Sequence, residues 1–545
     1  MRLDRLYIGE FKNLRDLQID FDERSPYTVI VGENGAGKSN LLEALTLIFR
    51  QLDLGRPAPF DYRLSYRCRD HDIKVEASAE AYPRVHARAK GAGDYRRLSR
   101  KEFAREDANG PLYRPAFVFG YYSGPTDRLA AFFERHRERY YDHIITAPEM
   151  RRPAADPNSL RRLFYAETLH GQFALLAFFM NSDDDDGGER AFLREKLQID
   201  GLDSVLFALK RPPWGGARRD GDSRFWEAVG EVQTFLDRVY DAALMPSRMS
   251  RRIAVDLAKN PAVESLYLFL RDAAALERVY HHYDGPYAFF TALESTHLSK
   301  LLGEVRTRVR MTPAAGGGEV TYRDLSEGEQ QLLLVLGLLK FTARSEALFL
   351  LDEPDTHLNP AWSTQYLDFL DRFMVDRDSC HILLTTHDPL VFAQLTRPQV
   401  RIFRRSGEGT AVVEEPLNDP RGMGIQAILA SDLFRLPSGG LDRATLRDIE
   451  RQRSLALKDS LTEEERNELR AVTDRLNTRA FWKQDRDPLY QLFMEQFMPR
   501  FAAAGGPVET ETSQVSFEDI RRREELADVV AEEIAREFAL EPPAL

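Results

Sequence analysis

Leu325-Ser326-Glu327-Gly328-Glu329-Gln330 is the stretch of this chain that decides its fold. It opens an apolar run, so we expect Ser326 and Gly328 in the first turn of a helix. A hydroxyl, a bare backbone and a helix N-terminus can together approach a phosphate group closely. The segment lies between a glycine-rich loop near the N-terminus and an apolar run that ends in Asp352-Glu353, which predicts a nucleotide-binding α/β fold.

The glycine-rich loop is Gly32-Glu33-Asn34-Gly35-Ala36-Gly37-Lys38-Ser39, which fits the pattern G-x-x-x-x-G-K-[ST] in full. A strand-like run precedes it and a helix-like run follows, as the motif requires. The glycines let backbone N–H groups close around phosphates. We expect Lys38 to reach the β- and γ-phosphates of ATP and Ser39 to give Mg²⁺ a hydroxyl ligand. The loop as far as Asn40 is predicted to bind the nucleotide.

A second chemical element is the apolar run Ala347–Leu351, which is followed by Asp352 and Glu353. Five successive apolar residues suit a strand that is buried on both faces of a sheet. The carboxyl end of such a strand is where ligands of open α/β sheets bind. We expect Asp352 to bind Mg²⁺ and Glu353 to polarise the attacking water, a role worth about 10²–10⁴ in rate.

His387 follows a third apolar run, His381–Thr385, and so stands at another strand end. It could be a catalytic histidine that senses the γ-phosphate, or a hydrogen-bonded structural residue, which is the commoner role of a lone histidine. Its position 34 residues after Glu353 favours the catalytic role.

The composition of the chain is that of an ordinary globular protein, with 545 residues, 43% hydrophobic and 30% charged, and a net charge of −12. No apolar run approaches the roughly 18 residues that span a bilayer, so we expect no membrane association. Cys68 and Cys380 are the only cysteines and lie far apart, which argues against a disulfide framework. The first residues show no signal-peptide pattern, and a cytoplasmic location is expected.

These elements together resemble the RecF/SMC-like ABC-type ATPases, a broad group of P-loop proteins of bacterial DNA repair and antiphage defence. The resemblance covers about 1–125 and 319–415. It implies that two heads sandwich two ATP molecules, with Ser326, Gly328 and Glu329 of one subunit against the nucleotide of the other. Phe11-Lys12-Asn13-Leu14 looks like the family's opening segment, so Lys12 and Asn13 are expected at the nucleotide. Asp355–Pro360 looks like its D-loop, which crosses the dimer interface.

The resemblance and the change of periodicity along the chain divide it into four segments. We predict an α/β fold in which an ABC-type head is split by an insertion. The segments are the N-terminal lobe at 1–125, a mainly helical insertion at 126–318, the second lobe at 319–415 and a helical extension at 416–545. The extension ends in an acidic stretch with a candidate amphipathic helix at Asp519–Phe538, and is expected to bind a partner or to close the domain.

Three functions are compatible with such a protein. The first is an ATP-hydrolysing, dimerising sensor that acts on DNA in antiphage defence, as in Septu-type systems, where a separate nuclease subunit cuts. The second is a RecF-like ATPase of DNA repair and recombination. The third is the ATP-binding subunit of a transporter. Leu325–Gln330 resembles the signature motif of ABC-type ATPases, but its Glu327 and Glu329 replace the usual residues of transporters, and this signature and the large insertion argue against a transporter. The residues after 400 show no nuclease pattern, so any cutting is expected of a partner.

Overall fold

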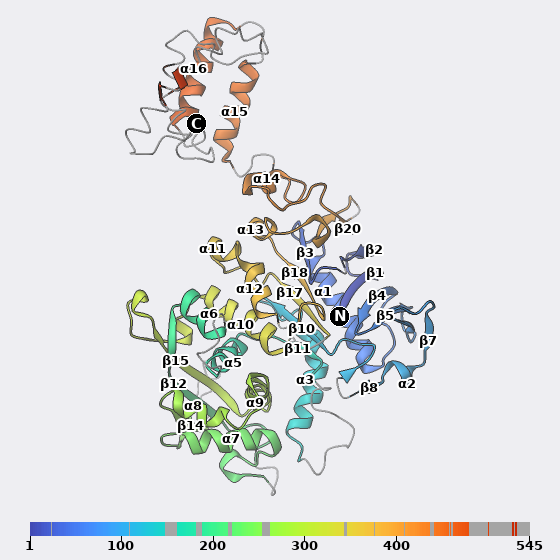
Figure 1. Ribbon diagram of the computed structural model, residues 1–545, viewed down its shortest axis with the longest axis vertical. Coiled ribbons are helices and arrows are strands. Elements are labelled where there is room, and N and C mark those ends of the chain that lie inside the picture. Colours follow the sequence, from blue (N-terminus) through green and yellow to red (C-terminus); the bar gives the residue numbers. More distant parts are fainter. Residues whose placement is uncertain are drawn as a thin grey trace. The chain divides into compact units, whose positions relative to one another are not determined.

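The computed structural model describes residues 1–545 except 23, 108–109, 148–160, 181–187, 216–220, 253–261, 343–345, 375, 408, 437–440, 457, 459–460, 479–496, 498–499, 501–525, 528 and 531–545. The chain forms two compact units, Met1–Leu436 and Pro437–Leu545 (Figure 1). In the described part of the chain, no helix combines the length and the apolar character needed to cross a membrane.

A seven-stranded sheet lies at the centre of the first unit, and its strand order is β11-β10-β17-β18-β3-β19-β20. All of its strand pairs are parallel except β19 with β20. The strands are β3 (Tyr27–Gly32), β10 (Phe117–Tyr122), β11 (Leu163–Tyr165), β17 (Ala347–Asp352), β18 (Cys380–Thr385), β19 (Val400–Arg405) and β20 (Ala411–Glu414).

Strand β17 is buried on both faces, as its apolar run predicts. Leu348 and Leu350 belong to the core that contains helix α1 (Lys38–Leu54), whereas Phe349 and Leu351 belong to the core that contains helix α10 (Glu327–Thr342). Alternate residues of a strand point to opposite faces, so helices must cover both sides of the sheet. This arrangement leaves the carboxyl ends of the parallel strands as the place where polar side chains gather.

A six-stranded antiparallel sheet, β2-β1-β4-β5-β6-β7, packs with α1 in the N-terminal lobe. The turn between β1 and β2 carries Lys12 and Asn13, and Lys12 has a left-handed backbone with φ 55°. The strands are β1 (Arg2–Phe11), β2 (Leu14–Asp20), β4 (Tyr62–Cys68), β5 (His71–Ala77), β6 (Arg84–Ala89) and β7 (Arg96–Leu98); α2 (Arg100–Phe103), β8 (Glu106–Asp107) and β9 (Gly110–Pro111) follow.

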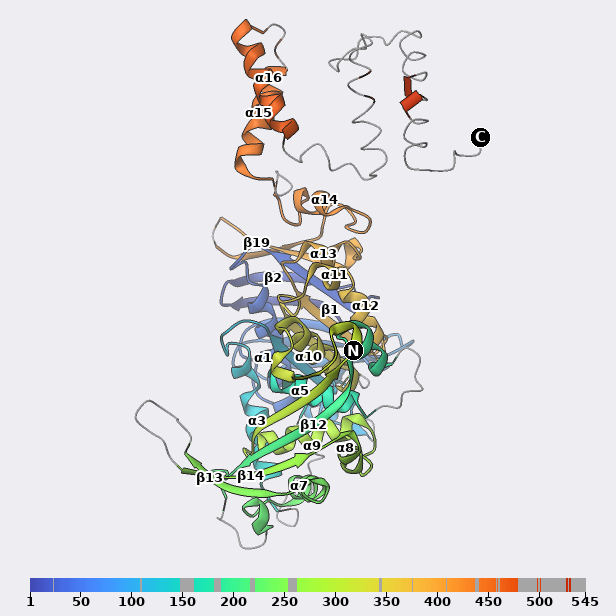
Figure 2. The same ribbon diagram turned by 90° about the vertical axis from the view of Figure 1, so that its left-hand side faces the viewer.

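The segment at 126–318, predicted as a mainly helical insertion, also contains strands. Beside its helices it contains a five-stranded sheet, β13-β14-β12-β15-β16, whose strands β12, β13 and β14 are seen in Figure 2. The strands are β12 (Ile199–Lys210), β13 (Ser247–Arg252), β14 (Ala262–Leu270), β15 (Leu302–Met311) and β16 (Glu319–Thr321). The helices are α3 (Ala130–Ile144), α5 (Leu169–Phe178), α6 (Glu189–Lys196), α7 (Gly230–Ala242), α8 (Ala273–Tyr280) and α9 (Pro286–Leu298).

The physical reason for this sheet can be read along β15. Val305, Thr307 and Val309 are buried while Arg306 and Arg308 between them are exposed, which is the two-residue period of a half-buried strand. The segment at 126–318 also contributes a strand to the central sheet, because β11 pairs with β10.

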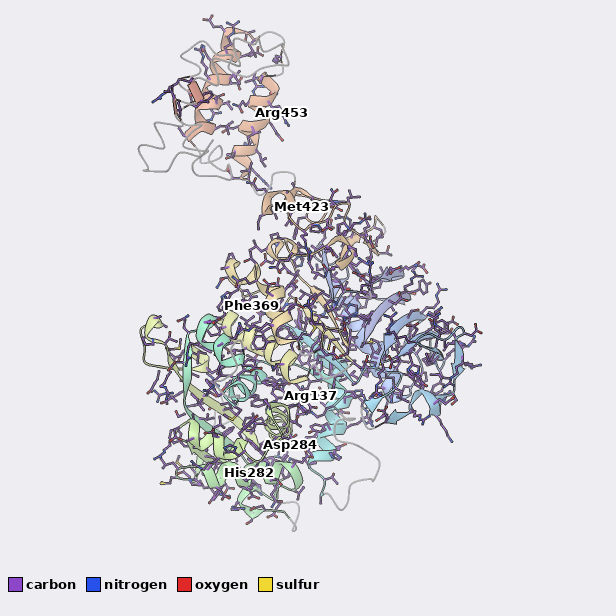
Figure 3. The ribbon with its side chains drawn as sticks, in the orientation of Figure 1. Arg137, His282, Asp284, Phe369, Met423 and Arg453 are labelled. Atoms are coloured by element: carbon purple, nitrogen blue, oxygen red, sulfur yellow. The ribbon has the colours of Figure 1, made fainter. Side chains whose placement is uncertain are left out.

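The insertion packs on the second lobe through aromatic rings. Phe192 of α6 lies 5.0 Å from Phe373 and 5.7 Å from Phe369, between ring centroids, and both partners belong to α12 (Tyr366–Phe373). Figure 3 labels Phe369 at this place. Two short helices complete this lobe, α11 (Pro360–Ser363) and α13 (Pro389–Phe392).

The described part of 416–545 is helical, as predicted. Helix α14 (Ile425–Ala430) belongs to the first unit, while α15 (Arg443–Ala456) and α16 (Glu463–Thr478) form a hairpin in the second. Arg451 of α15 pairs with Glu468 of α16 at 2.6 Å. The amphipathic helix predicted at Asp519–Phe538 lies outside the described residues, apart from four positions in it.

Candidate functional site

The glycine-rich loop joins β3 to α1 and is held in a shape that excludes larger residues. Gly37 has φ 110°, and a Cβ added to it would lie 2.8 Å from Cδ2 of Leu14. The Lys38 ammonium is buried in the loop and donates to the carbonyls of Gly32 at 2.8 Å and Glu33 at 3.1 Å. Burial lowers the pKa of Lys38, while nearby carboxylates oppose that shift. The loop is therefore suited to bind an anion, and the Lys38 ammonium lies within it.

Asn13 and Asn40, both predicted to bind the nucleotide, lie beside each other at this loop. The Asn40 amide donates to Oδ1 of Asn13 at 2.6 Å, and the Asn13 amide donates to the carbonyl of Gly35 at 3.2 Å. Lys12 is turned toward helix α1, where it pairs with the buried carboxylate of Glu43. The turn between β1 and β2 is thereby tied to both the loop and the helix that follows it.

Asp352 ends strand β17 with a buried carboxylate that meets two hydroxyl groups. Thr385 of β18 donates to its Oδ1 at 2.5 Å, and the Ser39 side chain is also hydrogen-bonded to it. Burial raises the pKa of Asp352, an effect that these hydrogen bonds oppose. A hydroxyl and a carboxylate side by side form the oxygen donor set that Mg²⁺ prefers, so Ser39 and Asp352 fit the predicted metal site.

Glu353 has an unusual backbone, with φ 53° in the left-handed region. Such a conformation costs roughly 1–3 kcal/mol in a residue that has a side chain, and it persists only where neighbours fix it. Its N–H donates to the carbonyl of Thr385 at 3.1 Å, and its own carbonyl accepts from the Thr356 hydroxyl at 2.7 Å. Because of this left-handed backbone, the chain turns sharply at the end of β17 and the Glu353 carboxylate points out of the strand.

The Glu353 carboxylate faces His387, with 3.1 Å between Oε1 and Nε2. The hydrogen bond from His387 lowers the pKa of Glu353, so the carboxylate is ionised at neutral pH. The two side chains are 37% and 39% exposed, and both can therefore reach a ligand from solvent. The structure thus brings the three predicted catalytic residues, Lys38, Glu353 and His387, together with Asp352.

The predicted signature residues form a separate group at the start of α10. The Ser326 backbone N–H and hydroxyl donate to one oxygen of Glu329, at 2.7 and 2.8 Å, which is a capping box. Glu329, predicted to bind the nucleotide, is thus occupied as a helix cap in this structure. In the described part of the chain, the recorded contacts of Ser326, Gly328 and Glu329 do not reach the glycine-rich loop.

Three residues at the site escaped the sequence analysis. Thr385 joins Asp352 to Glu353, and its place before Thr386-His387 was the available signal. Arg128 donates to Asn40 at 2.7 Å and to Glu43, and no local pattern marks it. Gln331 is buried one helical turn beyond Gly328 and bonds to the carbonyl of Glu353.

Comparisons with known proteins show what the chain is similar to. Residues 27–393, more than half of the chain, match the family described as "AAA domain, putative AbiEii toxin, Type IV TA system". The chain is 26% identical over 161 residues to Septu protein PtuA of Bacillus mycoides (strain KBAB4), covering 28% of this chain and 22% of that protein. It is 50% identical over 86 residues to the DNA replication and repair protein RecF of Synechococcus sp. (strain JA-2-3B'a(2-13)), covering 16% and 21%.

The matched segments thus span about a fifth of the length of these relatives. Among solved structures, the SMC head domain from Thermotoga maritima is similar at 13% identity, with 76% of this chain and 99% of that chain covered. Its TM-score of 0.30 is too low to bear on the fold. The match over residues 27–393, with the phosphate loop and the carboxylates at the strand end, shows that the chain belongs to this AAA domain family, as an ABC-type ATPase of the RecF/SMC-like group.

Proposed function

We propose that this protein binds ATP with Mg²⁺ and hydrolyses it, using Glu353 as the residue that activates water. The observation that carries the proposal is the ionised Glu353 carboxylate, 3.1 Å from His387 and next to the buried Asp352 at the end of β17. A carboxylate on a strained turn, with a fixed hydrogen-bond partner, is the arrangement expected of a group that must hold one orientation.

The residues around Glu353 would bind the phosphates and Mg²⁺ and orient the Glu353 carboxylate. Lys38, already within the loop, would neutralise charge on the transferred phosphate. Ser39 and Asp352 would hold Mg²⁺, which supplies additional positive charge to the phosphates when bound. His387 orients the Glu353 carboxylate through the hydrogen bond from its Nε2, and so would link that carboxylate to the γ-phosphate site.

We further propose that two copies of the chain share their sites. Ser326 is exposed at a helix start that the chain's own glycine-rich loop does not use, and Gly328 follows it in the first turn, buried against the backbone of His357. A helix N-terminus with a hydroxyl and a bare backbone suits the phosphates of a nucleotide held by a second copy. Hydrolysis would then depend on dimerisation.

The proposed biological setting is antiphage defence, with DNA as the nucleic acid and a separate nuclease subunit as the effector. The similarity to Septu protein PtuA supports this setting, and it extends over 161 residues. A role in DNA replication and repair is the second candidate, which the 50% identity to RecF over 86 residues favours. Co-purification separates the two: a nuclease bound to the full chain supports defence, whereas replication proteins in its place support repair.

The hydrolytic role is tested with the variant Glu353→Gln. It should bind ATP with unchanged affinity, since Glu353 is outside the glycine-rich loop, and should release phosphate at least about 10²-fold more slowly than the wild type. Lys38→Ala is the control that should lose binding itself. A Glu353→Gln protein that turns over ATP at the wild-type rate would remove Glu353 from the mechanism.

A further inference from the structure

The start of α10 is packed directly on the turn that follows Glu353. A Cβ added to Gly328 would lie 2.4 Å from the carbonyl oxygen of His357, far inside contact distance. Glu327 beside it lies 3.3 Å from Nδ1 of His357. Because backbone meets backbone here, a displacement of the helix start must displace the turn Asp355–Leu358 as well.

Gln331, one helical turn further along α10, extends this contact into the core. Only 4% of it is exposed, and its amide makes three hydrogen bonds. The His357 backbone N–H donates to Oε1 at 3.2 Å, which fixes the orientation of the amide because that N–H can only donate. The Nε2 group therefore faces Tyr121 of β10, at 3.1 Å from its hydroxyl, and the carbonyl of Glu353, at 3.4 Å.

Of these three hydrogen bonds, the one from Gln331 to the Glu353 carbonyl bears on the proposed hydrolysis. The Glu353 carbonyl belongs to a residue with φ 53°, and it accepts from both Gln331 and the Thr356 hydroxyl. A strained backbone keeps its conformation only while such neighbours hold it. The direction of the Glu353 carboxylate toward His387 thus depends on a side chain that is carried by the signature helix.

We infer that Gln331 is a positioning residue that couples the signature segment Leu325–Gln330 to the orientation of Glu353. Contact of the second copy's nucleotide with the exposed Ser326 would shift the start of α10, and Gln331 would transmit the shift to the turn that orients the carboxylate. The inference rests on the proposed hydrolytic role of Glu353 and on the proposed sharing of sites between two copies.

The test compares full-length variants at two buried glutamines. Gln331→Met keeps the length of the side chain and removes all three hydrogen bonds. It should leave the affinity for a fluorescent ATP analogue within twofold of the wild type, while kcat for phosphate release falls at least tenfold. The matched control is Gln172→Met on α5, where the buried amide accepts from Thr307 of β15 at 3.4 Å; its kcat should stay within twofold.

A second variant keeps the test informative if Gln331→Met folds poorly. Gln331→Glu retains the acceptor for the His357 N–H but sets a carboxylate oxygen against the Glu353 carbonyl, so kcat should fall although the contact to the turn remains. Tyr121→Phe removes only the third bond and should retain most of the activity.

The outcomes distinguish a failure of the coupling role of Gln331 from a failure of the hydrolytic role of Glu353. Wild-type kcat in both Gln331 variants overturns the coupling role, and so does a parallel loss of affinity and kcat, which would mean a general collapse of the site. Glu353→Gln is assayed beside them. If Glu353→Gln has a low kcat while both Gln331 variants keep the wild-type kcat, only the coupling role of Gln331 is overturned. If Glu353→Gln itself keeps the wild-type kcat, the hydrolytic role of Glu353 is overturned.

Discussion

Glu353 and His387 are 34 residues apart in the chain, yet Oε1 of one lies 3.1 Å from Nε2 of the other. They meet because β17 and β18 are adjacent parallel strands, so that residues just beyond their carboxyl ends share one edge of the sheet. A parallel pair of strands thus brings a carboxylate and an imidazole together with no need for local sequence proximity.

His387→Ala should slow ATP turnover by about 10-fold or more, because the Glu353 carboxylate loses the partner that fixes its direction. Affinity for ATP should change little, since His387 lies outside the glycine-rich loop. Steady-state phosphate release and equilibrium nucleotide binding measure the two effects separately. His282→Ala, at an exposed histidine of the insertion (Figure 3), serves as the control. Equal rates of phosphate release in His387→Ala and His282→Ala would show that His387 has only a structural role.

Ser326→Arg should block hydrolysis while it leaves nucleotide binding intact, because an arginine at the helix start bars the approach to a phosphate. Lys38→Ala should fail to bind ATP at all. If sites are shared between copies, mixing the two inactive proteins creates mixed dimers with one complete site, and phosphate release should rise well above that of either protein alone. The absence of any recovery across mixing ratios would rule out the shared arrangement.

Thr385→Val should lower kcat, because the Thr385 hydroxyl donates to Asp352 at 2.5 Å and accepts from the N–H of Glu353 at 3.1 Å. Valine has nearly the same shape but no hydroxyl group. The buried Asp352 carboxylate therefore loses a hydrogen bond, at about 1–3 kcal/mol, while the Glu353 N–H keeps the backbone carbonyl of residue 385. Thr385→Ser keeps the hydroxyl and is the matched control. Thermal unfolding and phosphate release should both be impaired in the valine variant and near normal in the serine variant.

Asp355→Asn should alter the pH dependence of stability. Burial raises the pKa of Asp355 from 3.8 to about 7, and its carboxylate accepts a hydrogen bond from Thr386. A folded pKa above the unfolded value means that Asp355 contributes stability at low pH, and that this contribution is lost as the pH rises to about 7. The loss amounts to roughly 1.4 kcal/mol for each pH unit in that window.

Asparagine mimics the protonated carboxyl and does not titrate, so the variant should become more stable relative to the wild type between pH 5 and pH 8. Urea unfolding at several pH values measures the difference. Asp94→Asn, at an exposed turn, should follow the wild type throughout. Parallel curves for Asp355→Asn and the wild type would show that Asp355 does not titrate in this range.

The candidate site could be predicted from the sequence because its residues stand beside long apolar runs. The strands β17 and β18 are fully buried, and burial on both faces demands the uninterrupted runs that precede Asp352 and His387. The glycine-rich loop could also be recognised from the sequence, because its geometry restricts positions such as Gly37 to glycine.

The insertion sheet was missed for a different reason. Strand β12 pairs with β15 through three register shifts, and each shift breaks the alternation by which a strand is recognised. Gln331 was missed because its partners, Tyr121, Glu353 and His357, come from other parts of the chain. Within α10 it reads as an ordinary polar position, and only tertiary structure gives it a role.

Strand β3, which carries the phosphate loop, lies between β18 and β19 in the central sheet. Val29 pairs with Leu384 on one side and with Val400 on the other, so neither neighbour exists until most of the chain has been synthesised. Contacts of such long sequence separation form late and slowly. A ribosome-bound chain that ends before residue 380 therefore carries the complete loop sequence but lacks the strands that hold it, and nucleotide binding must wait for the second lobe.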